Sequence, residues 1–400
     1  MKIAMVHPRL TSKGGAENVV IWLSSELSSR GYEVSVISLE SNPDLWSEID
    51  LNKVRFIDLK TEARYSIGFM GRKLAPHLEG ADIVCAHNTP AHWWATNAVN
   101  RLKKDIPIIW YCHEPHRLTY FSITDEISVK NVQNDSIGSL PNQEAFAQRI
   151  RKRVRHQRVL KSRWRRKQDA TAVKSISSIL ANSQFTQENV KRAFGKDSKV
   201  CYPGIPESDK KPTYFSNRKG IVFLSNFVPS KNVFGMLGAV DKIVNQAGRK
   251  DIQFHFLGEG NSPEIQNYLK HKGLESYTEF HGFVSELEKQ ELLGSVRLCA
   301  FIPFCEPFGL VTLEAFRSGT PAIVSDHGGP AEVINNSGAG ITVNPFDVES
   351  IAKGILGTYD DVEKLERMSE AGQKILCDGF YIKHLTDRFE QNFKMLMDGF

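Results

Sequence analysis

Residues 296–319 read VRLCAFIPFCEPFGLVTLEAFRSG and contain the parts of one α/β unit. The continuous apolar beginning is typical of a strand buried on both faces of a parallel sheet. A loop with Pro and Gly follows, and the sequence from Gly309 predicts a helix that Gly319 closes as its C-terminal cap. The loop contains Glu306 and the helix contains Glu314. Two carboxylates therefore follow a strand, where open α/β sheets bind ligands.

Similar β-branched runs recur between helix-length segments along the whole chain. We expect a first set of strands at 2–8, 33–39, 54–59, 82–88, 107–114 and 178–183, and a second set at 221–226, 252–260, 277–283, 296–303, 320–326 and 340–343. Such strands predict the α/β class, with two Rossmann-like domains whose mainly parallel sheets face each other across a ligand-binding cleft.

The domain boundaries follow from composition. Residues 202–220 are rich in Pro, Gly and charge and predict an interdomain linker, which gives an N-terminal domain at 1–203 and a C-terminal domain at 204–380. The end of the chain, 381–400, predicts an amphipathic helix. Its apolar positions are Leu385, Phe389, Phe393 and Leu396.

The composition, 41% hydrophobic and 24% charged residues, is that of a folded globular protein and excludes a disordered chain. The apolar stretch at the start is shorter than a signal peptide, and no later segment has about 18 uninterrupted apolar residues. The six cysteines form no C-x-x-C pair. We therefore expect a cytoplasmic protein without a membrane span.

The net charge of +5 conceals a strongly basic segment at 149–167, which contains eleven Lys or Arg residues and no acidic residue. Without this segment the chain would have a net charge of −6. Three roles fit it: a solvated helix, a surface for anionic membrane or a lipid-diphosphate acceptor, or a nucleic-acid patch. No nucleic-acid module accompanies it, so we expect weak peripheral membrane contact and no nucleic acid. Arg151, Arg155 and Arg158 are the candidate contacts.

The residue types after the strands favour a nucleotide sugar as ligand. The helix that begins after Gly309 suits a phosphate, Glu306 suits sugar hydroxyls, and Glu314 suits a ribose diol. The alternative is that Glu306 is an ordinary acidic loop residue and that Glu314 is a solvent-exposed acid on the helix, neither with a ligand. Gly14 and Gly15 also precede an expected helix and allow close approach to an anion, although a tight turn would use them equally well.

The stretch 304–314, FCEPFGLVTLE, resembles the E-x7-E motif of glycosyltransferase family 4, whose members are retaining enzymes with the GT-B fold. Further matches occur in order along the chain. They are SKGGAENVV (12–20), YCHEP (111–115), ILANSQFTQENV (179–190), YPGI (202–205), PSKN (229–232), FLGEG (256–260), FHGFV (280–284) and GGPAEV (328–333). The resemblance implies that the first domain binds the acceptor, that the second binds the donor, and that helix 381–400 returns to the first domain.

The resemblance also implies roles for individual residues. Glu306 would contact the donor sugar, Glu314 the ribose, and the backbone of 308–310 the sugar and diphosphate. Residues 308–310 are Phe308, Gly309 and Leu310, and the further implied donor-side residues are Gly14, Gly15 and Gly258. Lys231 would face the diphosphate, or alternatively be a surface lysine, while Asn226 stands where the family has Arg.

On the acceptor side, His113 resembles the histidine that approaches the transferred sugar; the alternative is a satisfied polar residue. Glu114, His116 and Arg117 are further candidates. The family needs no metal and no cofactor beyond its co-substrate, here a GDP- or UDP-sugar.

The sequence thus predicts a retaining hexosyltransferase of polysaccharide biosynthesis, with mannose favoured, that acts on a glycan or lipid-linked saccharide. A catalytically degenerate nucleotide-sugar-binding partner is the alternative, since Asn226 brings no charge. A hydrolase using Glu306 and Glu314 fits less well, because both acids flank one helix start.

Overall fold

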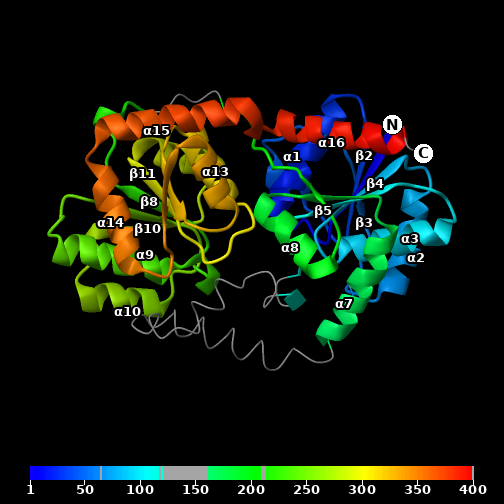
Figure 1. Ribbon diagram of the computed structural model, residues 1–400, viewed down its shortest axis with the longest axis horizontal. Helices are drawn as coiled ribbons and strands as arrows, with labels where there is room; N and C mark the ends of the chain where they lie inside the picture. Colours follow the sequence, from blue (N-terminus) through cyan, green and yellow to red (C-terminus); the bar gives the residue numbers. More distant parts are fainter. Residues whose placement is uncertain (64, 117–118, 121–160, 209–212, 399–400) are drawn as a thin grey trace. The chain divides into compact units, whose positions relative to one another are not determined.

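The computed structural model describes residues 1–63, 65–116, 119–120, 161–208 and 213–398. These residues form two compact units. The first contains the described residues up to Pro206 and those from Gly379 onward, and the second contains those of Glu207–Asp378. Each unit is a parallel sheet accompanied by helices (Figure 1).

The first unit has a seven-stranded sheet in the order β3-β2-β1-β4-β5-β6-β7, paired in parallel throughout. Its strands are β1 (Lys2–Val6), β2 (Glu33–Ser38), β3 (Arg55–Asp58), β4 (Ile83–His87), β5 (Ile108–Cys112), β6 (Ser178–Ala181) and β7 (Lys199–Val200). Its helices are α1 (Gly15–Ser29), α2 (Ile67–Leu78), α3 (Ala91–Leu102), α7 (Lys161–Ala172), α8 (Gln184–Phe194) and α16 (Ile382–Met397).

The second unit has a six-stranded parallel sheet in the order β10-β9-β8-β11-β12-β13. Its strands are β8 (Ile221–Leu224), β9 (Phe254–Leu257), β10 (Thr278–Gly282), β11 (Leu298–Phe301), β12 (Ala322–Ser325) and β13 (Gly340–Val343). Its helices are α9 (Val233–Asp241), α10 (Pro263–Lys272), α11 (Glu286–Ser295), α12 (Leu310–Arg317), α13 (Gly329–Ser337), α14 (Val348–Tyr359) and α15 (Val362–Ile375).

The predicted strands are confirmed, because each expected segment contains one observed strand. Their continuous apolar runs arise from burial on both faces: every residue of β8 and β11 is buried, and alternate side chains enter two separate core clusters. Strand β7 was not predicted, since its two residues are too few to give a period.

The predicted linker is wrong in its second half. Residues 213–220 pack in the second unit, where Phe215 is buried and the guanidinium of Arg218, only 1% exposed, lies 4.0 Å from the Phe215 ring centroid. Arg218 donates to the Gly319 carbonyl at 2.8 Å and to the Thr320 hydroxyl at 3.0 Å. The charge of Arg218 therefore belongs to a buried hydrogen-bonded group, whereas the neighbouring Lys219 is exposed.

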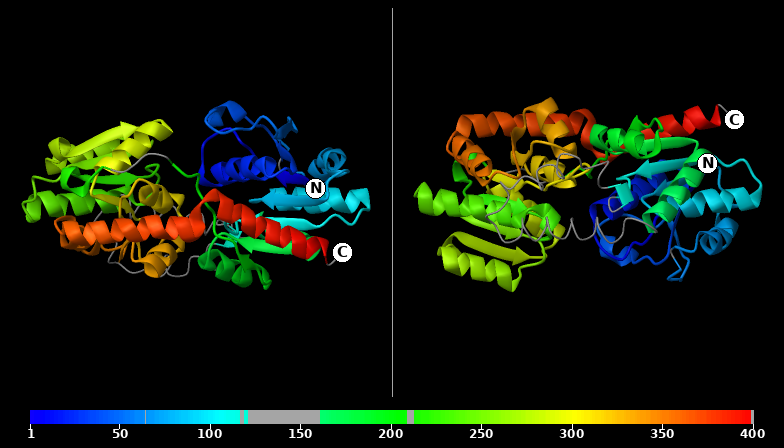
Figure 2. Two further views of the ribbon diagram at one scale, coloured as in Figure 1. Left: turned by 90° about the horizontal axis from the view of Figure 1, so that it is seen from above. Right: turned by 60° about the horizontal axis from the view of Figure 1, so that its bottom comes forward.

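The C-terminal helix α16 packs within the first unit, beside α1 (Figures 1 and 2). Arg30, at the end of α1, donates to Asp387 at 2.6 Å and to Glu390 at 3.0 Å. The apolar face of α16 is buried, with Phe389 fully inaccessible. The helical spacing predicted this face correctly.

Cysteine placement follows the apolar pattern. All six cysteines are free, and only Cys377 is exposed. Burial raises the pKa of the Cys201 thiol to about 12, so that thiol stays protonated. No helix within the described ranges combines the length and apolarity that crossing a membrane requires.

Candidate functional site

The strand order of the second unit reverses between β8 and β11, the position at which doubly wound sheets bind ligands. Asn226 and Lys231 lie in the segment after β8, and Glu306 lies in the loop after β11. The Phe304 N–H donates to the Ser230 carbonyl at 3.0 Å and joins these two segments. Asn226, Lys231 and Glu306 therefore lie at one end of this sheet, whereas the predicted donor-side residues Gly14 and Gly15 lie in the first unit.

Lys231 and Glu306 form an ion pair there. Nζ of Lys231 lies 2.5 Å from Oε2 of Glu306 and 5.5 Å from the Phe301 ring centroid. The two side chains are 27% and 19% exposed, so the pair is only partly screened by water. The sequence motifs predicted separate ligand contacts for these two residues, whereas in the structure each charge compensates the other.

The junction between the Glu306 loop and α12 requires a glycine. Gly309 has a φ of 84°, which residues with a Cβ rarely adopt, and an added Cβ would lie 2.6 Å from the Phe301 ring. Phe308 is buried and Leu310 is half-buried. Among the described side chains none makes a capping hydrogen bond at the start of α12.

A second helix begins beside the same loop. Gly328 precedes α13 with a φ of 87°, and the Gly329 N–H donates to the Glu306 carbonyl at 3.0 Å. A Cβ on Gly329 would lie 2.1 Å from the Pro307 carbonyl oxygen. These glycines bring the start of α13 against the Glu306 loop, an arrangement that suits an anionic ligand.

Glu314 is only 7% exposed, which overturns the alternative of a solvated helix acid. Its Oε1 lies 3.0 Å from Nζ of Lys289 on α11, and that Nζ lies 2.8 Å from Oε2 of Glu286. Burial opposes the charge on Lys289, but the two carboxylates outweigh it and raise the lysine pKa. Lys289 was not predicted as a site residue, and its only sequence signal is its i, i+3 spacing from Glu286.

Asn226 and Gly258 lie where the segments after β8 and β9 meet. Asn226 is exposed, and its side-chain oxygen accepts from the Glu259 N–H at 3.5 Å. Gly258 donates its N–H to the Gly282 carbonyl at 3.0 Å, and an added Cβ would lie 2.0 Å from the Ser225 carbonyl oxygen. Backbone packing alone thus requires glycine at 258, and its N–H is already engaged.

In the first unit, Gly14 and Gly15 stand at the start of α1 as predicted. Glu17 folds over this start, because a Cβ on Gly14 would meet its Oε2 at 2.2 Å. Burial raises the pKa of Glu17, and a hydrogen bond from its own backbone N–H partly offsets that effect. A carboxyl thus already lies at the helix start that the sequence analysis assigned to an anionic ligand.

His113 follows β5, and its Nε2 is buried without a hydrogen-bond partner among the described residues. Burial, with a smaller effect of His7, lowers the His113 pKa to about 3. Burial likewise lowers the His7 pKa to about 4, and His87 is fully buried with its ring 6.0 Å from that of His113. His7 and His87 were not predicted as site residues, although each histidine stands at the end of a predicted strand.

The other acceptor-side candidates are only partly described. Glu114 and His116 are half-buried, and Nδ1 of His116 lies 3.0 Å from the Thr119 hydroxyl and 3.5 Å from Nη1 of Arg165. Arg117, Arg151, Arg155 and Arg158 lie outside the described residues.

Helix α7 carries the described end of the basic segment. Asp169, 1% exposed, anchors it by accepting from His92 at 3.0 Å, Trp93 at 2.8 Å and Tyr120 at 2.9 Å. Trp164 is 39% exposed and contacts the Trp93 ring edge to face. The cationic side chains Arg163, Arg166 and Lys167 are exposed.

Two family profiles together span nearly the whole chain. The profile described as Glycosyltransferase Family 4 matches residues 13–209, and the one described as Glycosyl transferases group 1 matches residues 204–375. The chain belongs to glycosyltransferase family 4. The resemblance stated from the sequence motifs is thereby confirmed.

Individual relatives of this family 4 glycosyltransferase are distant. A glycogen synthase of Mycobacterium tuberculosis is 33% identical over 31% of this chain, and the match spans only 30% of that protein's length. Mannosylfructose-phosphate synthase of Agrobacterium fabrum is 21% identical over 92% of this chain and 83% of its own.

Solved structures agree with the family in fold. HepE of Anabaena, solved in complex with UDP and glucose, superimposes with a TM-score of 0.74 at 18% identity over 99% of this chain and 100% of that one. The glycosyltransferase has the GT-B fold, as predicted.

Proposed function

We propose that this chain is a retaining glycosyltransferase that moves a hexose from a nucleotide diphosphate sugar to a glycan or lipid-linked saccharide. The observation that carries the proposal is the Lys231–Glu306 ion pair at the β8/β11 reversal, beside the starts of α12 and α13. Lys231 would offset charge that develops on the leaving diphosphate, and Glu306 would accept from sugar hydroxyls. Glu314 would accept from the ribose.

In this proposal the acceptor attacks from the face that the diphosphate leaves, and the diphosphate assists its deprotonation. The protein supplies Lys231 and helix dipoles, and no metal takes part. His113 would serve as a neutral hydrogen-bonding group, because its pKa of about 3 keeps the imidazole uncharged at neutral pH.

For the donor we propose mannose from its GDP-sugar, with a UDP-hexose as the competitor. The name of mannosylfructose-phosphate synthase, matched over most of this chain, favours mannose. The UDP and glucose bound to HepE favour a UDP-hexose as the donor.

A catalytically degenerate nucleotide-sugar binder is the second candidate, and Asn226 favours it. This exposed amide occupies the position at which the family has Arg, so a cation that would face the diphosphate is replaced by a neutral group.

Nucleotide release from a panel of GDP-, UDP- and ADP-hexoses tests the proposal, with glycan and lipid-linked acceptors added. We expect release from one donor, and a 100- to 1000-fold (about 2.7–4 kcal/mol) lower rate in Lys231→Met and Glu306→Gln. Lys270→Met, an exposed lysine on α10, is the matched control and should match the wild type. Thermal stabilisation by a nucleotide without release would favour the degenerate binder, and no response to any nucleotide would overturn both candidates.

We also propose weak contact between the basic segment and anionic membrane at the cytoplasmic face. Each exposed cation would contribute about 1 kcal/mol. Flotation with phosphatidylserine vesicles should carry the wild type but much less of Arg163→Glu/Lys167→Glu, and phosphatidylcholine vesicles should carry neither. Equal, negligible flotation with both lipids would contradict this contact.

A further inference from the structure

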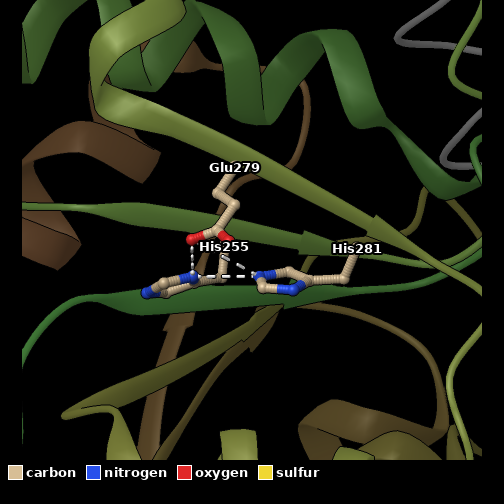
Figure 3. Close-up of side chains that lie close together, drawn as sticks. All are labelled: His255, Glu279 and His281. Carbon is tan, nitrogen blue, oxygen red and sulfur yellow. Dashed lines mark hydrogen bonds and ion pairs between the residues drawn. The ribbon is translucent and has the colours of Figure 1, made fainter.

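Two imidazoles and one carboxylate converge on the edge of the second unit's sheet (Figure 3). His255 lies on β9, and Glu279 and His281 lie on the edge strand β10. The strands pair in parallel with Glu279 opposite His255. Glu279 and His281 are two residues apart on β10, where the pairing with β9 becomes irregular between Phe280 and Gly282. The donor atoms of all three side chains nevertheless lie within 4.8 Å of one another.

The spacing of the three donor atoms is that of a metal coordination sphere. Nδ1 of His255 lies 3.1 Å from Nε2 of His281 and 3.3 Å from Oε2 of Glu279, and the latter two atoms lie 3.9 Å apart. Zinc ligands at about 2.0–2.2 Å in a tetrahedron would stand about 3.4 Å from one another. An ion could therefore contact all three atoms after shifts of a few tenths of an ångström.

The contact between Nδ1 of His255 and Nε2 of His281 needs a proton on one of the two nitrogens, and the carboxylate of Glu279 can only accept. A metal ion would take the place of that proton and bind all three atoms through their lone pairs. Neutral imidazole nitrogens and a carboxylate oxygen are atoms that ligate a divalent metal ion.

The surroundings hold the donors in place while leaving one side open. The His255 ring lies against Gly220, where an added Cβ would be 3.3 Å from Nε2. The side chains of His255 and His281 are 17% and 23% exposed, whereas that of Glu279 is 57% exposed, so an ion and a bound water can enter from solvent.

We propose that His255, Glu279 and His281 bind a zinc ion, with water as the fourth ligand. Two imidazoles with one carboxylate are a donor set that zinc sites use. The ion would clip the edge strand β10 to β9, close to the Gly258–Gly282 hydrogen bond that joins the ends of these strands. It touches none of the residues proposed for catalysis, so the site stands apart from the proposed sugar transfer.

Calorimetric titration of EDTA-treated, dialysed protein with ZnCl₂ tests the site without any nucleotide. We expect one ion per chain, a rise in the melting temperature, and a visible four-coordinate spectrum when CoCl₂ replaces zinc. His281→Gln and the more exposed Glu279→Gln should each weaken binding at least tenfold. The control His271→Gln, an exposed histidine on α10, should bind as the wild type does.

Three results would overturn the proposal: no stoichiometric binding, equal binding by wild type and both ligand variants, or equal losses in His271→Gln. Glu279→Gln keeps the test decisive if His281→Gln fails to fold, because the exposed Glu279 side chain contributes little to the core.

Discussion

The two units share one strand order around their central strands, yet the ends of their sheets carry opposite kinds of polar group. The first unit presents His7, His87 and His113, whose pKa values burial lowers, so they are neutral. The second presents compensated charges, Lys231 with Glu306 and Lys289 with Glu314. The same topology therefore supports hydrogen bonding without charge in one unit and handling of charge in the other.

The difference has a structural origin in what covers each end. His87 stacks on Phe389 of α16 at 6.2 Å between ring centroids, and apolar cover makes a charged imidazole costly. In the second unit, α11 supplies Lys289 to the buried Glu314. Neighbouring helices, rather than the sheets themselves, determine which state of a polar group is stable.

The largest effect should come from removing the cover of the histidine cluster. Phe389→Ala would delete a fully buried ring that contacts Tyr111 and His87, and we expect a loss of about 3–5 kcal/mol. Denaturant unfolding followed by tryptophan fluorescence measures it in the first unit alone, because all six tryptophans lie at or before position 164.

Met397→Ala is the matched control, since that side chain on the same helix is 44% exposed. It should change stability by no more than about 0.5 kcal/mol. Equal, small effects of both substitutions would mean that α16 does not support the cluster.

A fall in pH from 7 to 5 should destabilise the first unit but not the second. Unfolded histidine binds a proton below about 6.5, whereas folded His7 and His113 resist protonation until about 4 and about 3. Their stabilisation is present above pH 6.5 and is lost as pH falls, by about 2 kcal/mol for each at pH 5. The tryptophan-detected unfolding midpoint should therefore decline from pH 7 to 5, and less steeply in His113→Asn.

The charged cluster of Glu286, Lys289, Glu314 and Arg317 in the second unit should lose stability only at lower pH. Burial opposes ionisation of Glu286, but Lys289 and Arg317 outweigh it and lower its pKa. Its stabilisation is lost only as pH falls below the usual value near 4.5. A tryptophan signal that is insensitive to pH between 7 and 5 would refute the contrast.

The smallest of these effects concerns nucleotide affinity. Glu314→Gln keeps the shape of the side chain but removes the charge that faces Lys289, and we expect about tenfold weaker nucleotide binding, about 1.4 kcal/mol, by calorimetry. Glu366→Gln, an exposed acid on α15, is the control. Unchanged affinity in Glu314→Gln would remove this carboxylate from the proposed ribose contact.

Much of the fold could be predicted because its signals are local in the chain. Apolar runs located every strand except the two-residue β7, and helical spacing located α16. The segment at 213–220 shows the limit of composition: its charge indicated a tether, but Arg218 finds acceptors at residues 319 and 320, about a hundred positions away.

The sequence by itself determined the α/β class, the succession of strands and helices along the chain, and the presence of polar residues directly after strands. Periodicity and turn chemistry act over a few residues, so these features can be seen locally. Only the tertiary structure decided which of these groups meet. Lys231 and Glu306 come from separate segments, as do Lys289 and Glu314, and His255 lies on a different strand from Glu279 and His281. Their pairing depends on sheet register and helix packing, which bring together residues that share no local pattern.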